Sequence, residues 1–235
     1  EPMNNLMSTL DEIAFQVRTC TGCQLSQGRN NAVPGEGSAE AEVMFIGEGP
    51  GFHEDRLGRP FVGPAGQFLD DLLRSIGLNR EQVFIANMIK CRPPQNRDPL
   101  PAEMAACNKY LDRQIELINP KLIVTLGRFS LGRFFPGEGI TRARGKVREK
   151  DGRHIYPIMH PAAALHRQEN RSTIVNDFKG IPDILAKLSR REPGPSSELP
   201  VAQIKEQTVE QALEPAAIPQ RNEITEPQQL SLFTS

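Results

Sequence analysis

The sequence lacks any long hydrophobic run. No apolar stretch in its 235 residues approaches the roughly 20 residues that a membrane-spanning helix needs. No basic segment followed by an apolar one opens the chain, as it would in a secretory signal peptide, and there are no internal repeats. We therefore expect a soluble cytoplasmic protein with no membrane partner, and, because no spare apolar surface is evident, a monomer.

The chain has almost no net charge, but its charges are unevenly distributed. It contains 28 Lys and Arg and 29 Asp and Glu, for a formal charge of −1. Residues 192–235 hold seven acidic and two basic side chains, so they carry −5 and the preceding residues carry +4. The basic stretch 141–153 fits a nucleic-acid footprint. A hairpin with solvated charges would explain that stretch equally well.

Short apolar runs rich in β-branched residues alternate with helical patterns. The runs span residues 42–47, 82–89, 121–127 and 154–160. This alternation predicts a parallel sheet covered by helices on both faces, and such sheets bind ligands at the carboxyl ends of their strands. The pattern ends near residue 191.

The remaining residues differ sharply from the rest in composition. Residues 192–228 are rich in Pro, Glu and Gln, which predicts a disordered acidic linker after a folded domain at residues 1–191. An apolar segment, residues 229–233, follows the linker. We therefore expect three parts: a domain, a tether and a short terminal motif.

The chain has only four cysteines, and their positions suggest a metal site. Cys20 and Cys23 form a C-x-x-C pair, Cys91 follows the second expected strand, and Cys107 lies in the next expected helix. Without a secretory context, four cysteines favour metal binding over disulfides. A redox C-x-x-C pair plus two core thiols is the alternative. Four thiolates suit zinc or an iron–sulfur cluster equally.

A long loop rich in Gly and Pro follows the first expected strand, and loops of this length usually serve a function. Its GEGPG segment is a poor dinucleotide-binding fingerprint, because the next helix begins only near Ala65. Glu48 and Glu54 lie in this loop, and Asn87 and His160 follow the second and fourth strands. A parallel sheet would bring these side chains to one rim.

These residue types suit hydrolysis of a bond to a flat heterocycle. An asparagine offers a donor and an acceptor to a base edge, and Phe61 offers a face for stacking. A histidine can donate a hydrogen bond to an oxygen that gains charge, and a carboxylate can orient or deprotonate water. Each residue alone has an ordinary structural explanation; together they indicate a site.

Three motifs resemble the family 4 uracil-DNA glycosylases, thermostable-type enzymes that carry a four-iron, four-sulfur cluster. The motifs are GEGPGFHEDRLGRPFVGPAG (47–66), NMIKCRPPQNRDPLP (87–101) and HPAAAL (160–165), and with the four cysteines the resemblance covers residues 6–190. It implies a three-layer α/β/α sandwich around a four-stranded parallel sheet. It also implies excision of uracil from DNA, leaving an abasic site, as the first step of base excision repair.

The resemblance also implies roles for residues in the pocket. Glu48 would orient or activate the attacking water, and His160 would stabilise charge on O2 of the departing uracil. Phe61 would stack on the uracil, and Asn87 would read its N3 and O4 groups and so refuse cytosine. Gly49 would belong to the same pocket.

Further roles concern the surroundings of the pocket. Glu54 would close the pocket against the methyl group of thymine or hold the loop. Leu165 would wedge into the duplex where the base leaves. Three arginines would contact the DNA backbone, namely Arg167, Arg92 and Arg97. All four cysteines would hold a structural [4Fe–4S] cluster, which the resemblance favours over zinc.

A related branch of the superfamily traps its product covalently through a histidine in the basic insertion before the fourth strand. Here the only histidine of that region, His154, comes at the start of the strand itself, so we expect turnover. Two alternatives remain: a binding module that traps uracil or abasic DNA, and a zinc-bearing nucleotide-binding protein that never contacts DNA.

The terminal apolar segment is outside this resemblance. Its sequence, QLSLF, resembles the peptide by which bacterial replication and repair proteins bind the sliding clamp, with anchors at Gln229, Leu230, Leu232 and Phe233. A disordered linker would give such a peptide reach. A chance amphipathic end is the alternative. Clamp binding would keep the protein beside the nucleoid.

Overall fold

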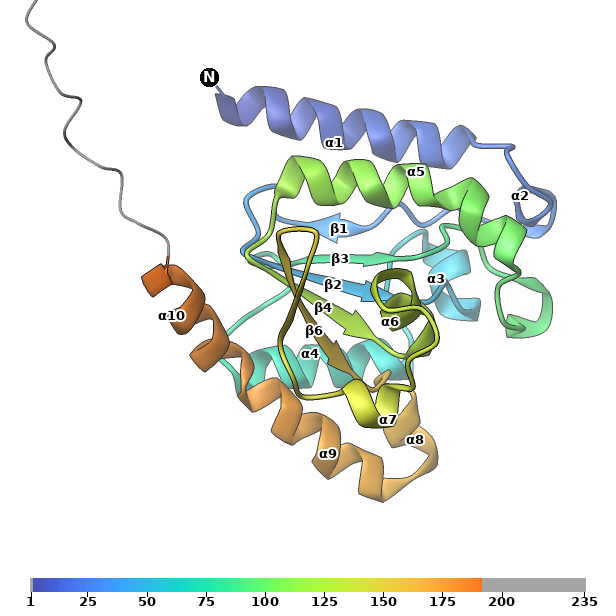
Figure 1. Cartoon of the computed structure of the whole chain (residues 1–235). Coiled ribbons are helices and arrows are strands. Elements are labelled where there is room, and N and C mark those ends of the chain that lie inside the picture. Colours follow the sequence, from blue (N-terminus) through green and yellow to red (C-terminus); the bar gives the residue numbers. More distant parts are fainter. Residues whose placement is uncertain (1, 192–235) are drawn as a thin grey trace, which may run out of the picture. The chain divides into compact units, whose positions relative to one another are not determined.

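The computed structural model describes residues 2–191, which form a mixed sheet of six strands in the order β1-β3-β2-β4-β6-β5 (Figure 1). The strands are β1 (Glu36–Gly37), β2 (Val43–Gly47), β3 (Phe84–Asn87), β4 (Leu122–Leu126), β5 (Arg148–Lys150) and β6 (Arg153–Ile158). The four central strands are parallel, and the two edge strands are antiparallel to their neighbours.

The prediction of a sheet of four parallel strands is therefore right for the centre of the sheet and wrong for its edges. β1 is only two residues long and includes Gly37, and β5 is a charged strand with mostly exposed side chains. Neither edge strand buries an apolar run, so hydrophobic patterning gave no signal for them. The tail at 192–228 and the motif at 229–233 lie outside the described residues.

The basic stretch contains a hairpin. Lys150 pairs with Arg153 across a tight turn, in which Asp151 and Gly152 both have positive φ angles, 51° and 72°. Such a pair of left-handed residues is typical of a two-residue hairpin turn. Arg144 is bound to Asp177 outside the hairpin, at 2.6 Å. Much of this stretch thus serves the fold.

Helices cover both faces of the sheet, as expected for three layers (Figure 1). α1 and α5 lie on one face, and α4, α9 and α10 lie on the other. The helices are α1 (Pro2–Thr19), α2 (Leu25–Gly28), α3 (Phe52–Leu57), α4 (Pro64–Ser75), α5 (Pro101–Ile118), α6 (Arg128–Phe134), α7 (Ile140–Ala143), α8 (Ala163–His166), α9 (Gln168–Lys179) and α10 (Ile181–Arg191), with a 3-10 turn at Pro94–Asn96.

The central strands supply both cores because their side chains alternate between the two faces. In β2, Phe45 packs towards α4 and α9 and stacks on Phe178 with ring centres 5.7 Å apart. Its neighbours Met44 and Ile46 pack towards α5. A strand buried on both faces reads as a continuous apolar run, which is why the sequence revealed these strands. None of the helices within residues 2–191 has the length and apolar character needed to cross a bilayer.

Candidate active site

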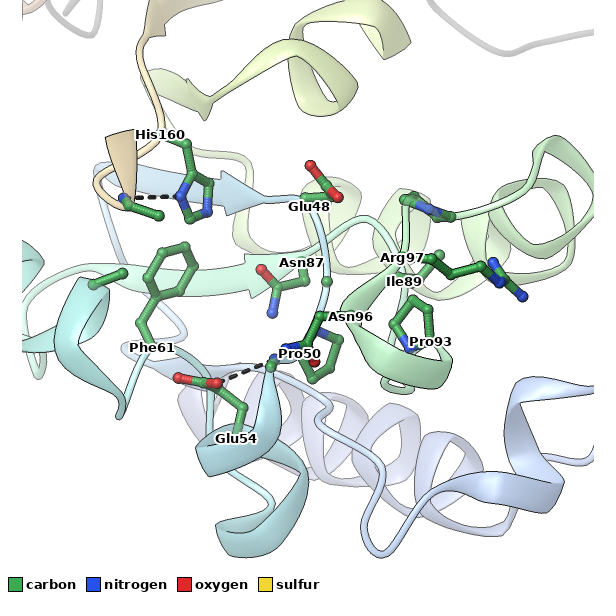
Figure 2. Close-up of a pocket in the computed structure, with 15 residues that line it drawn as sticks. Glu48, Pro50, Glu54, Phe61, Asn87, Ile89, Pro93, Asn96, Arg97 and His160 are labelled. Carbon is green, nitrogen blue, oxygen red and sulfur yellow. Dashed lines mark hydrogen bonds between the residues drawn. The ribbon is translucent and has the colours of Figure 1, made fainter. Parts of the chain in front are cut away.

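The carboxyl ends of three parallel strands meet at one cavity of about 420 Å³ (Figure 2). Glu48 directly follows β2, Asn87 is the last residue of β3, and His160 comes just after β6. All three line the cavity together with Phe61 and Glu54 from the long loop. The structure thus brings together the polar residues that the sequence placed at strand ends.

Glu48 carries a carboxylate in a partly desolvated position. Burial raises its pKa above the usual glutamate range, and the negative charge of Asp98 raises it further, whereas Arg128 opposes the shift. Asp98 and Arg128 form an ion pair at 2.5 Å. A carboxylate with a raised pKa is a better proton acceptor than an ordinary one, which suits a residue that handles water.

His160 is held as a neutral imidazole of defined tautomer. Its Nδ1 accepts a hydrogen bond from the backbone N–H of Ala162 at 3.1 Å, so the ring proton sits on Nε2. Burial lowers the pKa of His160 to about 4, against a smaller opposing effect of Glu54. Gly127, with φ of 95°, passes so close that an added Cβ would lie 3.2 Å from the Cβ of His160. A neutral Nε2–H is a hydrogen-bond donor at physiological pH.

Phe61 lies beside the imidazole in a backbone conformation that few non-glycine residues adopt. Its φ is 51°, and its ring stacks on that of His160 with centres 5.5 Å apart and planes 24° from parallel. An added Cβ at Gly47 would lie 2.6 Å from Cζ of Phe61, so the ring rests against bare backbone. Such strain is found at sites where surrounding contacts hold the residue in place.

Arg80 supplies those contacts, and sequence reasoning missed it. Its guanidinium donates to the carbonyl oxygen of Phe61 at 2.9 Å and to that of Pro60. It also pairs with Asp70 at 2.8 Å and with Glu36 at 2.7 Å. No motif marks Arg80 in the sequence, because its acceptors at the pocket are backbone carbonyls. Arg80 therefore anchors the loop that presents Phe61.

Asn87 presents its amide to the cavity (Figure 2). The residue is only 2% exposed, and within residues 2–191 its side chain has no hydrogen-bond partner. Its amide atoms are not among the buried polar atoms of the described residues that lack a partner, so they are open to the cavity, where a ligand can pair with them. Gly49, predicted in the same pocket, lines it as well, with its α-carbon close to the side chain of Ile89.

Glu54 is committed to the loop that contains it. One carboxylate oxygen accepts from the backbone N–H groups of Val62 and Gly63, each at 2.9 Å, and the other accepts from Gly51 at 3.1 Å. The last of these contacts caps the amino end of α3 (Figure 2). The geometry favours loop holding among the two roles considered for Glu54, although its side chain also lines the cavity.

All four cysteines line a second, smaller cavity. Cys91 and Cys107 are buried, and Cys20 and Cys23 are partly buried. The Sγ of Cys91 accepts a hydrogen bond from Nη1 of Arg29 at 3.0 Å. Burial raises the pKa of the Cys107 thiol to about 11. Without a metal this thiol would stay protonated.

Two basic side chains, Arg29 and Lys90, line this cavity, and burial lowers the pKa of Lys90 to about 7. Lys90 lies on its wall, is 1% exposed, and has a neutral partner, Oε1 of Gln114 at 2.8 Å. No group of three His, Cys, Asp or Glu residues in the described part of the chain is arranged around a single ion. The four thiols nevertheless face one space.

The residues expected on DNA lie outside the cavity or at its edge. Leu165, in α8, is 49% exposed, and Arg167 is exposed after it. Arg92 donates from Nε to Asn96 at 2.7 Å. Arg97 donates both terminal nitrogens to the buried carboxylate of Glu103, at 2.9 and 2.6 Å, so its guanidinium already has a partner within the chain.

Comparison with known proteins gives one consistent family. The profile described as the uracil DNA glycosylase superfamily matches residues 34–179. The chain is 49% identical over 189 residues to the type-4 uracil-DNA glycosylase of Sulfurisphaera tokodaii, covering 76% of this chain and 86% of the relative. It is 45% identical to the type-4 enzyme of Archaeoglobus fulgidus, covering 77% and 96%, and 42% identical to that of Thermotoga maritima, covering 76% and 95%.

Proposed function

Because the chain belongs to the uracil DNA glycosylase superfamily and is a uracil-DNA glycosylase that excises uracil from DNA, we propose that the cavity at the ends of β2, β3 and β6 binds and cleaves the uracil nucleotide. A base inside a duplex cannot reach such a cavity. The nucleotide must therefore rotate out of the stack into it.

Recognition falls to Phe61 and Asn87 in this proposal. The ring of Phe61 provides a flat face for the uracil, and the amide of Asn87 accepts from N3–H and donates to O4. Cytosine presents the opposite donor and acceptor pattern, so it would leave both groups of the amide unsatisfied. The observation that carries the proposal is this amide, which lines the cavity with no partner of its own within residues 2–191.

Cleavage breaks the bond between C1′ of the sugar and N1 of uracil. The bonding electron pair leaves with the uracil, and the sugar passes through a cation, as in other glycosyl hydrolysis. Glu48 orients the water whose oxygen bonds to C1′ and accepts its proton. The neutral imidazole of His160 donates from Nε2 to O2 of uracil, where negative charge develops. No protonated acid is needed, which agrees with the low pKa of this histidine.

A uracil-containing oligonucleotide treated with the protein and then with alkali tests this mechanism, beside matched thymine and cytosine controls. We expect strand breaks only at uracil, with many products per protein molecule. Glu48→Gln should abolish most excision while retaining DNA binding. A stoichiometric complex that resists denaturant would instead identify a trapping protein, and full activity of Glu48→Gln would refute the role of this carboxylate.

We also propose that Cys20, Cys23, Cys91 and Cys107 hold a [4Fe–4S] cluster. Four thiols facing one cavity, a buried lysine without an anionic partner in the described chain and the Arg29 hydrogen bond to sulfur all suit an anionic thiolate-bound group. When bound, the cluster supplies structural bracing and takes no part in the hydrolysis. Iron and acid-labile sulfide analysis tests the assignment, and one zinc per chain would refute it.

The cysteine site and the pocket are connected through the backbone. Ile89 donates its backbone N–H to the carbonyl of Glu48 at 3.1 Å, and Cys91 follows two residues later. A cluster that fixes Cys91 therefore also fixes the segment behind Glu48 and Asn87. This bracing is the role we propose for it.

The remaining proposals concern partners. We propose that Leu165, Arg167 and Arg92 contact the DNA around the cavity. Arg97 would first have to give up its ion pair with Glu103. Gln229, Leu230, Leu232 and Phe233 would bind the sliding clamp, which rests on sequence alone. A monomeric state and a location beside the nucleoid stay predictions.

A further inference from the structure

An exposed aromatic side chain lies beside the uracil pocket without a role in the proposed reaction. Phe52 is the first residue of α3, is 50% exposed, and follows Gly51, which lines the cavity. The guanidinium of Arg92 lies 5.3 Å from the centre of its ring. Arg92 is in turn bound to Asn96, another residue of the cavity wall (Figure 2). We name Phe52, Arg92 and Asn96 the flanking ledge.

The flanking ledge is pre-organised. Asn96 and its neighbour Gln95 both have φ of 55°, which fixes the turn from which the Asn96 side chain holds Arg92. On the Phe52 side, α3 begins at a glycine whose N–H is capped by Glu54. Two separate elements thus hold an aromatic ring and a guanidinium together. With His53 edge-on at 5.5 Å and Arg92 beside it, half of the Phe52 ring stays open to a further flat group.

We propose that the flanking ledge binds the nucleotide next to the uracil on the same strand, with its base stacked on Phe52 and its phosphate near Arg92. This inference rests on the proposed function. A nucleotide joined to the flipped uridine by one phosphodiester must pass the edge of the cavity. Aromatic rings accept any base by stacking, and guanidinium groups bind phosphate.

Single-stranded DNA should use the flanking ledge more than duplex DNA. In a duplex the neighbouring base stays paired and stacked, so placing it on Phe52 costs additional unstacking. In a single strand the same base is free to move. The flanking ledge therefore favours excision from single strands. Its removal should reduce the difference in kcat/KM between single-stranded and duplex DNA.

The test measures kcat/KM on single-stranded oligonucleotides that contain one uracil. In matched oligonucleotides an abasic-site analogue replaces the nucleotide on the 5′ side or on the 3′ side. The variants are Phe52→Ala, Phe52→Leu and Phe52→Trp. Phe15→Ala serves as the control, because Phe15 is 65% exposed on α1 and contributes nothing to the cavity.

We expect Phe52→Ala to lower kcat/KM about tenfold on the complete single strand, because the stacking of a base on the aromatic ring is lost. Phe52→Trp should keep the activity, and Phe52→Leu should lose it, since a leucine keeps the apolar bulk without the flat face. Removing the flanking base on one side should lower the kcat/KM of the wild type by a similar factor. The same removal should not lower the kcat/KM of Phe52→Ala any further.

Three outcomes would overturn the inference. They are unchanged activity of Phe52→Ala, full activity of Phe52→Leu, or a further drop in the kcat/KM of Phe52→Ala when the flanking base is also removed. An equal loss in Phe15→Ala would also overturn it. The wild type on the complete oligonucleotide separates the two proposals. If it fails to excise uracil, the proposed function fails; if it excises uracil and Phe52→Ala is normal, only the flanking ledge fails.

Discussion

Replacing Arg80 with methionine should disturb both stability and catalysis although Arg80 does not line the pocket. The guanidinium side chain is only 18% exposed and donates to the backbone carbonyls of Pro60 and Phe61. Hydrogen bonds from charged groups contribute about 1.5–3 kcal/mol each. Allowing for partial exposure, we expect Arg80→Met to lower the free energy of unfolding by about 2–4 kcal/mol.

The catalytic effect follows from the strained conformation of Phe61. A left-handed backbone costs a non-glycine residue about 1–2 kcal/mol, so without Arg80 the peptide should relax and carry the ring away from His160. A misplacement of about 1 Å can lower a rate a hundredfold, so we expect kcat/KM for a uracil oligonucleotide to fall at least about tenfold. Arg80→Lys should retain part of the activity that Arg80→Met loses.

Arg74→Met provides the matched control. Arg74 pairs with Asp71 at 2.5 Å, but its side chain is 70% exposed and it lies on α4 rather than in the loop that presents Phe61. An exposed ion pair contributes about 1 kcal/mol or less, and activity should be unchanged. Thermal unfolding and steady-state kinetics of both variants decide the matter. If Arg80→Met loses stability but keeps its kcat/KM, the reasoning about Phe61 is refuted.

Three further predictions follow from the site. The excision rate should fall at acid pH with a midpoint above the usual glutamate pKa, because burial and Asp98 raise the pKa of Glu48. In single-turnover measurements Asp98→Asn should move that midpoint to lower pH. An unmoved midpoint would exclude Glu48 as the group that titrates. Gly47→Ala should abolish uracil binding, because its methyl group would meet the Phe61 ring, whereas Gly132→Ala, with open space around its α-carbon, should behave as the wild type in the same binding assay. Deleting residues 229–233 should remove clamp binding in a pull-down and leave excision from short oligonucleotides intact; retained clamp binding would disprove the tail assignment.

The sequence predicted the centre of the fold because buried parallel strands read as apolar runs, and it predicted the pocket because polar residues follow those runs. Glu48, Asn87 and His160 could be found this way before any coordinates. Arg80 could not, since its acceptors are backbone carbonyls, which look alike at every position of a sequence. The edge strand β1 was missed for a related reason: it buries no apolar side chain. The strand β5 belongs to the charged hairpin that the sequence offered as one of two explanations of the basic stretch.

Phe52 shows a different limit. Its place in the loop motif was visible, but an exposed ring and a buried one look the same in a sequence. Only the structure shows the ring exposed at 50% with Arg92 beside it. Amphipathic α1 was also missed, although Ile13 and Val17 face the core.

The order of the strands has a consequence for how activity appears as the chain folds. β2 is the first of the parallel strands in the sequence yet lies between β3 and β4, and β6 joins last in sequence order. A sheet built from such distant segments forms slowly compared with local structure. A nascent chain that stops before His160 has the base-reading amide and the water-handling carboxylate but lacks the donor for the leaving group. Excision therefore reports completion of the whole sheet, and recovery of activity during refolding should follow the docking of β6.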